Sequence, residues 1–369
     1  MKGICNRWIL CVLFFSVAAC SSSAREKRGS AGPGTELLPK FEPGKLYEKL
    51  ACKSDPSVTY AIYFPTGYRE GARLPLFLAF DPGGRGTFAI RKYKDLADKY
   101  SFILMGSWNS RNNLPVEEID RIVYNLREEI VTRLPCDPDR LYMTGFSGGS
   151  RIASLVCMFQ KGIRGMIGCS AGFASIQQAP EYAFDYFGIV GNWDFNLNEM
   201  ILLDEKLETN GYRHFLLICK GGHDWPSDTI MEFGIRWHLK KDSDPSFTED
   251  LAKLREAGMV FPASSFTKEI REKEMALQQE YRDLFLVRDL DWWKKTISKL
   301  RKTKGLSGEE VSMNKRLLSF LSLVCWAQSD RALTNRNTEA ATYSITLYEM
   351  VDPENPEIRR MKAELAKMK

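Results

Sequence analysis

One short segment, LYMTGFSGG, joins a strand pattern to a helix pattern through a turn that holds a serine between glycines. Residues 141–143 are apolar, as in a buried strand, and residues 151–159 have an apolar face at helical spacing. Gly145 and Gly149 flank Ser147 in the pattern G-x-S-x-G, where side chains at the glycine positions would collide in a tight turn. The segment therefore predicts strand, turn and helix in that order. The alternative is a glycine-rich loop in which the serine is incidental.

The chain on both sides of this segment repeats the alternation between strand and helix periods. Strand patterns occur at residues 58–64, 74–80, 102–105, 141–144, 166–169, 186–190 and 214–219, and helix patterns at residues 90–100, 116–134, 151–159, 197–208 and 227–239. Strands that alternate with helices predict an α/β fold with a mostly parallel, doubly wound sheet. Ligands bind beyond the carboxyl ends of the strands in such sheets, so functional side chains are expected directly after strands.

Residues 1–19 have the composition of an export signal. Lys2 and Arg7 make a basic beginning, residues 8–15 form an apolar core too short to span a bilayer, and small residues precede Cys20. The sequence Val-Ala-Ala-Cys resembles the lipobox of bacterial lipoproteins, in which the cysteine is lipidated and becomes the N-terminus. We therefore expect an exported protein that is lipid-anchored through Cys20 at the bacterial cell envelope, with a plain secretory signal as the alternative.

Residues 20–42 are predicted to be a flexible tether. Within them, residues 21–34 lack apolar periodicity and are rich in serine, glycine and charge. The folded body would then hang from the membrane by its lipid alone.

The charge of the chain does not favour nucleic acid as a partner. The formal net charge is +5, and loss of Lys2 and Arg7 with the signal would reduce the 52 basic residues to 50, against 47 acidic ones. There is no zinc-ligand spacing and no alternation of aromatic and basic residues. We expect no nucleic acid, metal or cofactor, and contact with a membrane only through the lipid.

Six of the nine cysteines lie beyond Cys20. An exported protein can pair its cysteines, and Cys52 with Cys136 is the most loop-like candidate pair. Cys157, Cys169 and Cys219 lie in apolar helix or strand patterns and are typical of small buried residues. The sequence itself fixes no pairing.

The three histidines differ in their position relative to the strands. His223 lies in the segment KGGHDWP directly after the strand pattern 214–219, whereas His214 begins that strand and His238 lies in a helix pattern. An imidazole is the side chain whose ordinary pKa suits proton transfer near neutral pH. We therefore predict His223 as a catalytic base, and surface or packing roles for the other two.

A carboxylate that orients this histidine is expected after a neighbouring strand. Asp194 follows the strand pattern 186–190 and lies between Ser147 and His223 in the chain. Asp224 is an alternative, although a side chain adjacent to the histidine rarely reaches back to Nδ1 and better suits a helix cap. We predict Asp194, with a plain capping role for it as the remaining alternative.

A tetrahedral intermediate needs two hydrogen-bond donors for its oxyanion, one after the nucleophile and one from a loop after another strand, here the strand pattern 74–80. Gly148 supplies the first N–H. The loop DPGGRG, residues 81–86, supplies the second, and Gly83 is preferred with Gly84 in reserve because Pro82 has no N–H. The alternatives are a simple turn or a phosphate-binding loop, but the Lys-Ser/Thr ending of a Walker motif is absent.

Residues 58–240 resemble the α/β-hydrolase superfamily. The segments 137–149 (DPDRLYMTGFSGG) and 221–226 (GGHDWP) are similar to polyhydroxybutyrate depolymerase-like and feruloyl-esterase-like enzymes. The resemblance implies a serine esterase that works through an acyl-enzyme and needs no cofactor. One departure is Asp81-Pro-Gly83, where that branch has His-Gly-Cys or a similar sequence, so family substrate contacts do not carry over.

Four further side chains are candidates for binding substrate. Trp108 and Arg111 lie in a loop after a strand and suit an aromatic or anionic group, although a solvated loop explains them equally well. Trp193 and Trp225 are adjacent to the predicted acid and base and are expected to wall the pocket, with packing as the alternative.

Residues 242–369 differ from the preceding domain, residues 43–241. Helix patterns occur at residues 266–288, 292–303, 314–326, 339–351 and 356–369, without strand alternation. Residues 339–356 resemble the second helix of a tetratricopeptide repeat. We expect an all-helical region that offers a surface to a protein partner.

Together these features predict a lipid-anchored serine hydrolase that acts on esters of small molecules or acylated carbohydrate. Two alternatives remain: a serine peptidase of the same fold, and a catalytically inactive scaffold that binds partners through its helical region.

Overall fold

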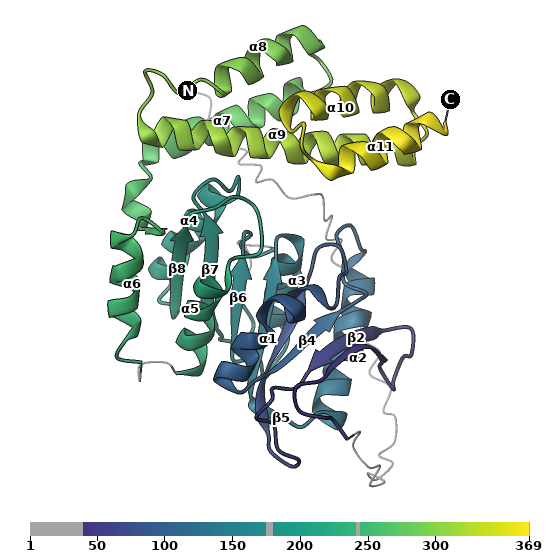
Figure 1. The fold of residues 1–369 in the computed structure, drawn as a ribbon, viewed down its shortest axis with the longest axis vertical. Helices are drawn as coiled ribbons and strands as arrows, with labels where there is room; N and C mark the ends of the chain where they lie inside the picture. Colours follow the sequence, from purple (N-terminus) through teal and green to yellow (C-terminus); the bar gives the residue numbers. More distant parts are fainter. Residues whose placement is uncertain (1–39, 175–179, 241–243, 369) are drawn as a thin grey trace, which may run out of the picture. The chain divides into compact units, whose positions relative to one another are not determined.

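The computed structural model describes residues 40–174, 180–240 and 244–368 (Figure 1). The predicted signal, Cys20 and nearly all of the predicted tether lie outside these residues. The folded unit begins at Phe41. Within the described ranges, no helix combines the length and the apolar character that crossing a membrane requires.

A single sheet of nine strands runs through the described residues in the order β1-β2-β4-β3-β5-β6-β7-β8-β9 (Figure 1). The six central strands, from β4 to β8, are parallel, and β1, β2 and β9 are antiparallel to their neighbours. The strands are β1 (Leu46–Ala51), β2 (Thr59–Tyr63), β3 (Leu74–Phe80), β4 (Ile103–Ser107), β5 (Cys136–Phe146), β6 (Gly165–Cys169), β7 (Asp185–Gly191), β8 (His214–Cys219) and β9 (Val260–Phe261). The prediction of a mostly parallel sheet is confirmed.

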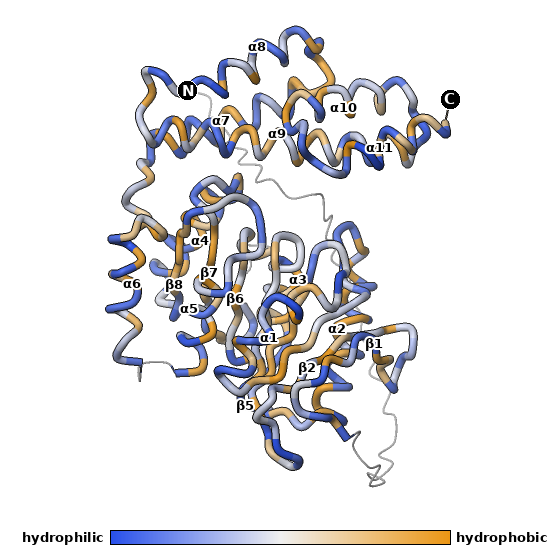
Figure 2. Tube along the Cα trace, in the orientation of Figure 1, coloured by the Kyte–Doolittle hydropathy of each residue, from blue (hydrophilic) through white to orange (hydrophobic). Residues whose placement is uncertain are grey.

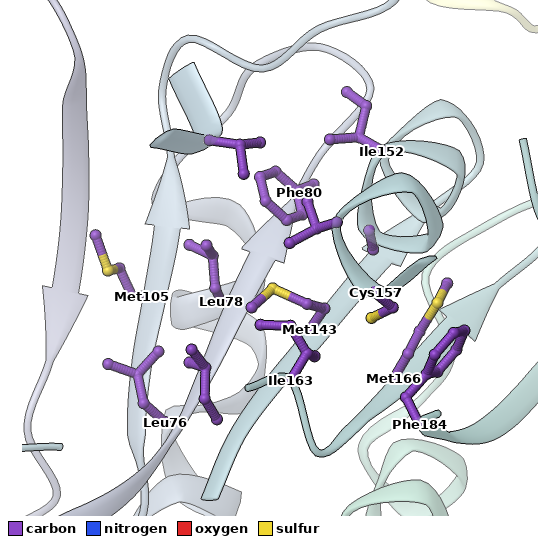
Figure 3. Packing of buried hydrophobic residues seen from close by; sticks show 14 of the residues in the cluster. Leu76, Leu78, Phe80, Met105, Met143, Ile152, Cys157, Ile163, Met166 and Phe184 are labelled. Atoms are coloured by element: carbon purple, nitrogen blue, oxygen red, sulfur yellow. The ribbon is translucent and has the colours of Figure 1, made fainter. Parts of the chain in front are cut away.

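Helices cover both faces of the sheet, because side chains of the central strands alternate between two cores. In β3, Leu76, Leu78 and Phe80 pack in the core that includes α2, α3 and α4, whereas Phe77 and Ala79 pack in the core that includes α1 and α5. Figure 3 shows the first of these cores in close-up. These helices are α1 (Phe88–Tyr100), α2 (Val116–Arg133), α3 (Gly148–Phe159), α4 (Leu197–Thr209) and α5 (Asp228–Leu239).

The sheet extends beyond both ends of the predicted α/β pattern. Strand β1 was not expected, because LYEKLA is a partly exposed edge strand whose apolar residues neither alternate with polar ones nor form a continuous run. On the other side, α6 (Phe247–Glu256) leads into β9, which pairs with β8. The α/β domain therefore continues past residue 241, the predicted boundary, to Phe261. Leu251 and Val260 pack there at the edge of the core that includes α1 and α5. A strand of only two apolar residues gives too little periodic signal to be predicted from sequence.

The region after β9 is helical, as the sequence predicts. Its helices are α7 (Lys268–Leu284), α8 (Leu290–Leu300), α9 (Gly308–Thr334), α10 (Thr338–Val351) and α11 (Pro356–Ala366). They enclose a third core around the fully buried Trp293, Leu317 and Ala341. Helix α9 is longer than predicted because a capping box between Ser307 and Glu310 starts it early. Figure 2 shows the contrast between apolar central strands and helices such as α6 and α7, in which hydrophobic and hydrophilic residues alternate.

The candidate disulfide between Cys52 and Cys136 is absent. All six cysteines of the described residues are free and buried. The thiol of Cys136 donates to the carbonyl of Ile130 at 3.5 Å, and both Cys52 and Cys136 belong to the first core. What looked like loop positions in the sequence are buried beside α2, so these cysteines act as small apolar residues.

Candidate active site

A sharp turn after β5 places Ser147 at the carboxyl edge of the sheet. Ser147 has φ of 51° and ψ of −121°, a backbone conformation that L-residues rarely adopt. The flanking glycines make this turn sterically feasible. A Cβ on Gly145 would lie 2.3 Å from the carbonyl oxygen of Gly149, and a Cβ on Gly149 would lie 2.0 Å from that of Phe80. The sequence G-x-S-x-G is therefore required by the close approach of α3 to β3 and β5.

Three side chains from the ends of β5, β7 and β8 meet beyond this turn. The Nε2 atom of His223 lies 2.9 Å from Oγ of Ser147. The Nδ1 atom of His223 lies 3.0 Å and 3.1 Å from the two carboxylate oxygens of Asp194. Nδ1 therefore carries the proton that faces the carboxylate, which leaves the Nε2 lone pair directed at the serine hydroxyl.

The Asp194 carboxylate is fully buried, with 0% of its side chain exposed. Its Oδ1 also accepts a hydrogen bond from the backbone N–H of Asn196 at 2.8 Å. Asn192 braces the same loop, because its N–H donates to the carbonyl of Cys219 and its Oδ1 accepts from the N–H of Gly221. The loops after β7 and β8 are thus tied together, which fixes the carboxylate relative to the imidazole.

Asp224, the alternative acid, has a different partner. Its Oδ1 accepts a hydrogen bond from the backbone N–H of Trp225 at 2.7 Å. The structure therefore places Asp194, and not Asp224, on Nδ1 of His223.

Two aromatic rings hold the imidazole of His223. The ring centroid of Phe195 lies 4.2 Å from that of His223, and the ring centroid of Phe146 lies 4.8 Å from it on tilted planes. Both rings exclude water from the imidazole and restrict its rotation. Neither Phe195 nor Phe146 was predicted as a site residue. Their signal was adjacency, since Phe195 follows Asp194 and Phe146 precedes Ser147.

The other histidines lie away from this contact, as their positions in the sequence suggested. His214 begins β8 at the opposite end of the strand, with its Nε2 3.1 Å from a carboxylate oxygen of Asp204. His238 is buried in α5, where its Nε2–H donates to the carbonyl of Met166. Burial lowers the pKa of His238 to about 3, so this imidazole is neutral.

The backbone N–H groups predicted to bind the oxyanion differ in whether they already have a hydrogen-bond acceptor within the protein. Gly148 is the first residue of α3, where backbone N–H groups have no partner within the helix. The N–H of Gly83, however, already donates to Oδ1 of Asp81 at 2.9 Å, and the N–H of Gly84 donates to the Asp81 carbonyl at 3.0 Å. The buried carboxylate of Asp81, whose role was not predicted, thus competes for the donor expected of this loop.

Asp81 holds the loop as an ionised anchor. Burial raises its pKa, but hydrogen bonds from Arg85 and Trp225 outweigh this and leave the pKa of the carboxyl below its ordinary value. The Arg85 contacts are bidentate at 2.8 Å each, and the Trp225 indole donates at 3.1 Å. The closed network accounts for the conformation of the DPGGRG turn.

Of the four residues predicted to bind substrate, the three tryptophans contact other parts of the protein. Trp108 donates its indole N–H to the carbonyl of Glu48 in β1, and Trp225 is buried behind Phe146. Trp193 is half-buried, with Nζ of Lys315 lying 3.9 Å from its ring centroid. Arg111 is exposed on the loop after β4.

The helical region contacts the loop that carries the acid. Nη1 of Arg316 in α9 donates to the carbonyl of Asn192 at 3.0 Å, and the Gln278 amide in α7 donates to the carbonyl of Phe195 at 3.3 Å. The Phe195 ring also packs in the helical core. The backbone on both sides of Asp194 is therefore held by helices that lie far later in the sequence.

No protein-family model and no curated protein matches the chain. Among solved structures it is similar to the S-formylglutathione hydrolase FrmB of Staphylococcus aureus, with 13% identity over 55% of this chain and 100% of that chain and a TM-score of 0.43. It is also similar to esterase B of Lactobacillus rhamnosis, with 12% identity over 59% and 91% and a TM-score of 0.45. A ferulic acid esterase has 15% identity over 54% and 97% and a TM-score of 0.42.

The topology itself defines the fold class. A mostly parallel sheet with antiparallel β2, a serine on a strained strand-to-helix turn, and the chain order Ser147, Asp194, His223 are the features of the α/β-hydrolase fold. The chain has this fold, with a helical region after it.

Proposed function

We propose that the protein is a serine hydrolase that cleaves ester bonds. The observation that carries the proposal is the continuous hydrogen-bonded line from Ser147 through His223 to the buried carboxylate of Asp194, with contacts of 2.9 Å and 3.0 Å. Such a line activates a hydroxyl that is otherwise a weak nucleophile.

The reaction follows from the positions of these groups. His223 accepts the hydroxyl proton on Nε2 as Ser147 Oγ attacks the ester carbonyl, and Asp194 stabilises the resulting imidazolium through Nδ1. The N–H of Gly148 donates to the oxyanion. His223 then gives the proton to the leaving alcohol. A water molecule next attacks the acyl-enzyme while His223 accepts its proton, and His223 returns that proton to Ser147 Oγ as the bond to the acyl group breaks and the acid is released.

Small esters and acylated carbohydrate are the substrates that we propose. The support is the resemblance of the DPDRLYMTGFSGG and GGHDWP segments to feruloyl-esterase-like enzymes and the likeness of the fold to esterases. A peptidase remains the second candidate from the sequence. A panel of acetyl, feruloyl and short-chain acyl esters beside peptide substrates distinguishes the two by the ratio of kcat/KM values.

Labelling with a fluorophosphonate tests the activity itself. The wild-type protein is expected to form an adduct, and Ser147→Ala is expected to form none while unfolding at the same temperature. A folded wild-type protein without a Ser147-dependent adduct would falsify the proposal and favour the inactive scaffold.

Export and anchoring through Cys20 are a separate proposal, supported by the signal-like residues 1–19 and the lipobox-like sequence before the cysteine. Mass spectrometry of the mature N-terminus is expected to find a diacylglyceryl-modified Cys20. Cys20→Ser is expected to move the protein from the membrane fraction to the soluble fraction. An unmodified N-terminus elsewhere would indicate a plain secretory signal.

A further inference from the structure

The oxyanion site lacks one of its two expected donors among the loop N–H groups. The N–H groups of Gly83 and Gly84 are both bonded to Asp81, as described above. Freeing either would break part of the Asp81 network. Gly148 alone would leave the oxyanion with a single donor, whereas acyl-transfer sites use two or more.

A side chain from the loop after β4 occupies the space beside Gly148. A Cβ placed on Gly148 would lie 1.7 Å from Oδ1 of Asn112 and 3.4 Å from its Nδ2. The Asn112 amide therefore sits where the side chain of the residue after the nucleophile would otherwise be. Any residue larger than glycine at position 148 would displace it, so Gly148 and Asn112 are complementary.

The backbone of Asn112 is held in place by a hydrogen bond, whereas its side-chain amide is free to bind another group. The backbone N–H of Asn112 donates to the carbonyl of Pro82 at 2.9 Å, which ties this loop to the Asp81 turn. The side chain is half-buried and has no hydrogen-bond partner among the described residues. A terminal amide carries two N–H donors and one acceptor on a broad, roughly two-fold torsion, so a rotation about χ2 presents Nδ2 where Oδ1 now lies.

We propose that Asn112 is a catalytic residue that donates its side-chain N–H to the oxyanion, beside the backbone N–H of Gly148. This inference rests on the proposed serine hydrolase activity and adds a residue to it. An anion that develops beside Gly148 attracts the donor end of the amide and repels the acceptor end. The interaction is therefore stronger in the transition state than with the substrate, and it is expected in kcat and not in KM.

Two variants that keep the branched shape of the Asn112 side chain and remove its N–H donor test the proposal. Asn112→Leu and Asn112→Asp are each expected to lower kcat by about 10²-fold to 10³-fold with little change in KM, and the aspartate is expected to be the worse because it places a negative charge beside the oxyanion. The phosphonylation rate of Ser147 by a fluorophosphonate is expected to fall in the same order, which makes the test independent of the natural substrate. Asn113→Gly is the matched control, since Asn113 is exposed with φ of 64°.

A double-mutant cycle with Gly148 gives a second readout. Gly148→Ala alone is expected to lower kcat because its methyl group drives the amide away, whereas in an Asn112→Ala background the same change is expected to cost much less. This coupling reports the contact itself even where Asn112→Leu lowers the unfolding temperature.

The outcomes separate the two proposals. Asn112→Leu and Asn112→Asp proteins that retain kcat within about three-fold of wild type (less than 1 kcal/mol) overturn the role of Asn112, and Ser147-dependent hydrolysis by the same preparations leaves the hydrolase proposal intact. Additive effects of Asn112→Ala and Gly148→Ala also overturn it. Wild-type protein with no Ser147-dependent reaction overturns both.

Discussion

Nη1 of Arg316 donates a hydrogen bond of 3.0 Å to the backbone carbonyl of Asn192, across 124 residues of sequence. The same guanidinium forms a buried ion pair with Glu274 in α7, in which both side chains have 0% exposure. Arg316 thus links two helices of the C-terminal region to the loop that carries Asp194. The helical region is in this way part of the support of the candidate active site.

Removal of one member of this ion pair is expected to destabilise the protein strongly. Arg316→Met leaves the Glu274 carboxyl buried without its partner, and burial already raises the pKa of Glu274. We expect a loss of about 3–5 kcal/mol in the free energy of unfolding, measured by urea denaturation.

Replacement of both members separates stability from support of the acid. Glu274→Met with Arg316→Met is expected to recover most of the lost free energy, because two apolar side chains fill the space of the pair. The Asn192 carbonyl still lacks its donor in this double variant, so kcat/KM is expected to stay below wild type. Full activity of the double variant would show that the bond to Asn192 does not position Asp194.

Substitutions of Asp194 and Asp224, the two aspartates near His223, are expected to affect activity differently. Asp194→Asn keeps the shape of the side chain but removes the charge that stabilises the imidazolium, so kcat is expected to fall by about 10³-fold to 10⁴-fold. Asp224→Asn is the matched change next to the histidine in the chain, and it is expected to retain nearly full activity because the Asp224 carboxylate accepts from the N–H of Trp225 and does not contact Nδ1 of His223. Steady-state kinetics of ester hydrolysis measures both. Equal losses of kcat in the two variants would contradict the assignment of Asp194 alone as the residue that stabilises the imidazolium.

Because His238 is buried in its neutral form, the free energy of unfolding is expected to fall as the pH is lowered. Its pKa is about 3 in the folded protein, against about 6.5 in the unfolded chain. Below pH 6.5 the unfolded chain therefore binds a proton that the folded protein does not, and stability falls by about 1.4 kcal/mol per pH unit until pH approaches 3. Above pH 6.5 both states are neutral and this contribution is constant.

His238→Gln keeps a donor for the Met166 carbonyl and removes the titrating group. Between pH 7.5 and 5, urea unfolding of the glutamine variant is expected to lose about 2 kcal/mol less than wild type. The slopes of the two proteins should coincide between pH 7.5 and 8.5. Parallel profiles throughout the acid range would mean that His238 becomes protonated in the folded state.

A reductant is expected to have no effect on the stability of the protein. The six described cysteines are free and buried, and burial, with Glu129 and Asp55 nearby, raises the pKa of Cys52 to about 12. A reductant is therefore expected to leave the unfolding temperature unchanged. A thiol reagent is expected to react slowly with the native protein and fully in denaturant. A fall of the unfolding temperature on reduction would indicate a disulfide.

Local patterns were sufficient for most of the α/β domain. Strand β8 has the predicted bounds, 214–219, because the apolar run FLLIC, followed by Lys-Gly-Gly, is typical of a buried strand that ends at a turn. Edge elements were harder. Strand β1 and the two-residue β9 owe their conformation to pairing with β2 and β8, and such pairing leaves no periodic signal in so short a segment.

The same difference holds within the candidate active site. The glycines, Ser147, Asp194 and His223 each follow a strand, so the topology of a parallel sheet brings them to one edge. The packing of Phe195 on His223 could not be predicted, because the ring also belongs to the core of helices more than seventy residues later. Gly83 was a reasonable choice of donor from sequence, but the carboxylate of Asp81 two residues earlier takes its N–H.

The sequence by itself determined the α/β class, the strained turn at Ser147 and the order of the groups that meet there, because these depend on hydrophobic period, steric freedom at glycine and the geometry of parallel strands. Only the tertiary structure decided which donors remain available beside Gly148 and what holds the Asp194 loop. Asn112 and Arg316 reach these places from a distant loop and a distant helix. Contacts of that kind depend on how whole elements pack, which no local pattern encodes.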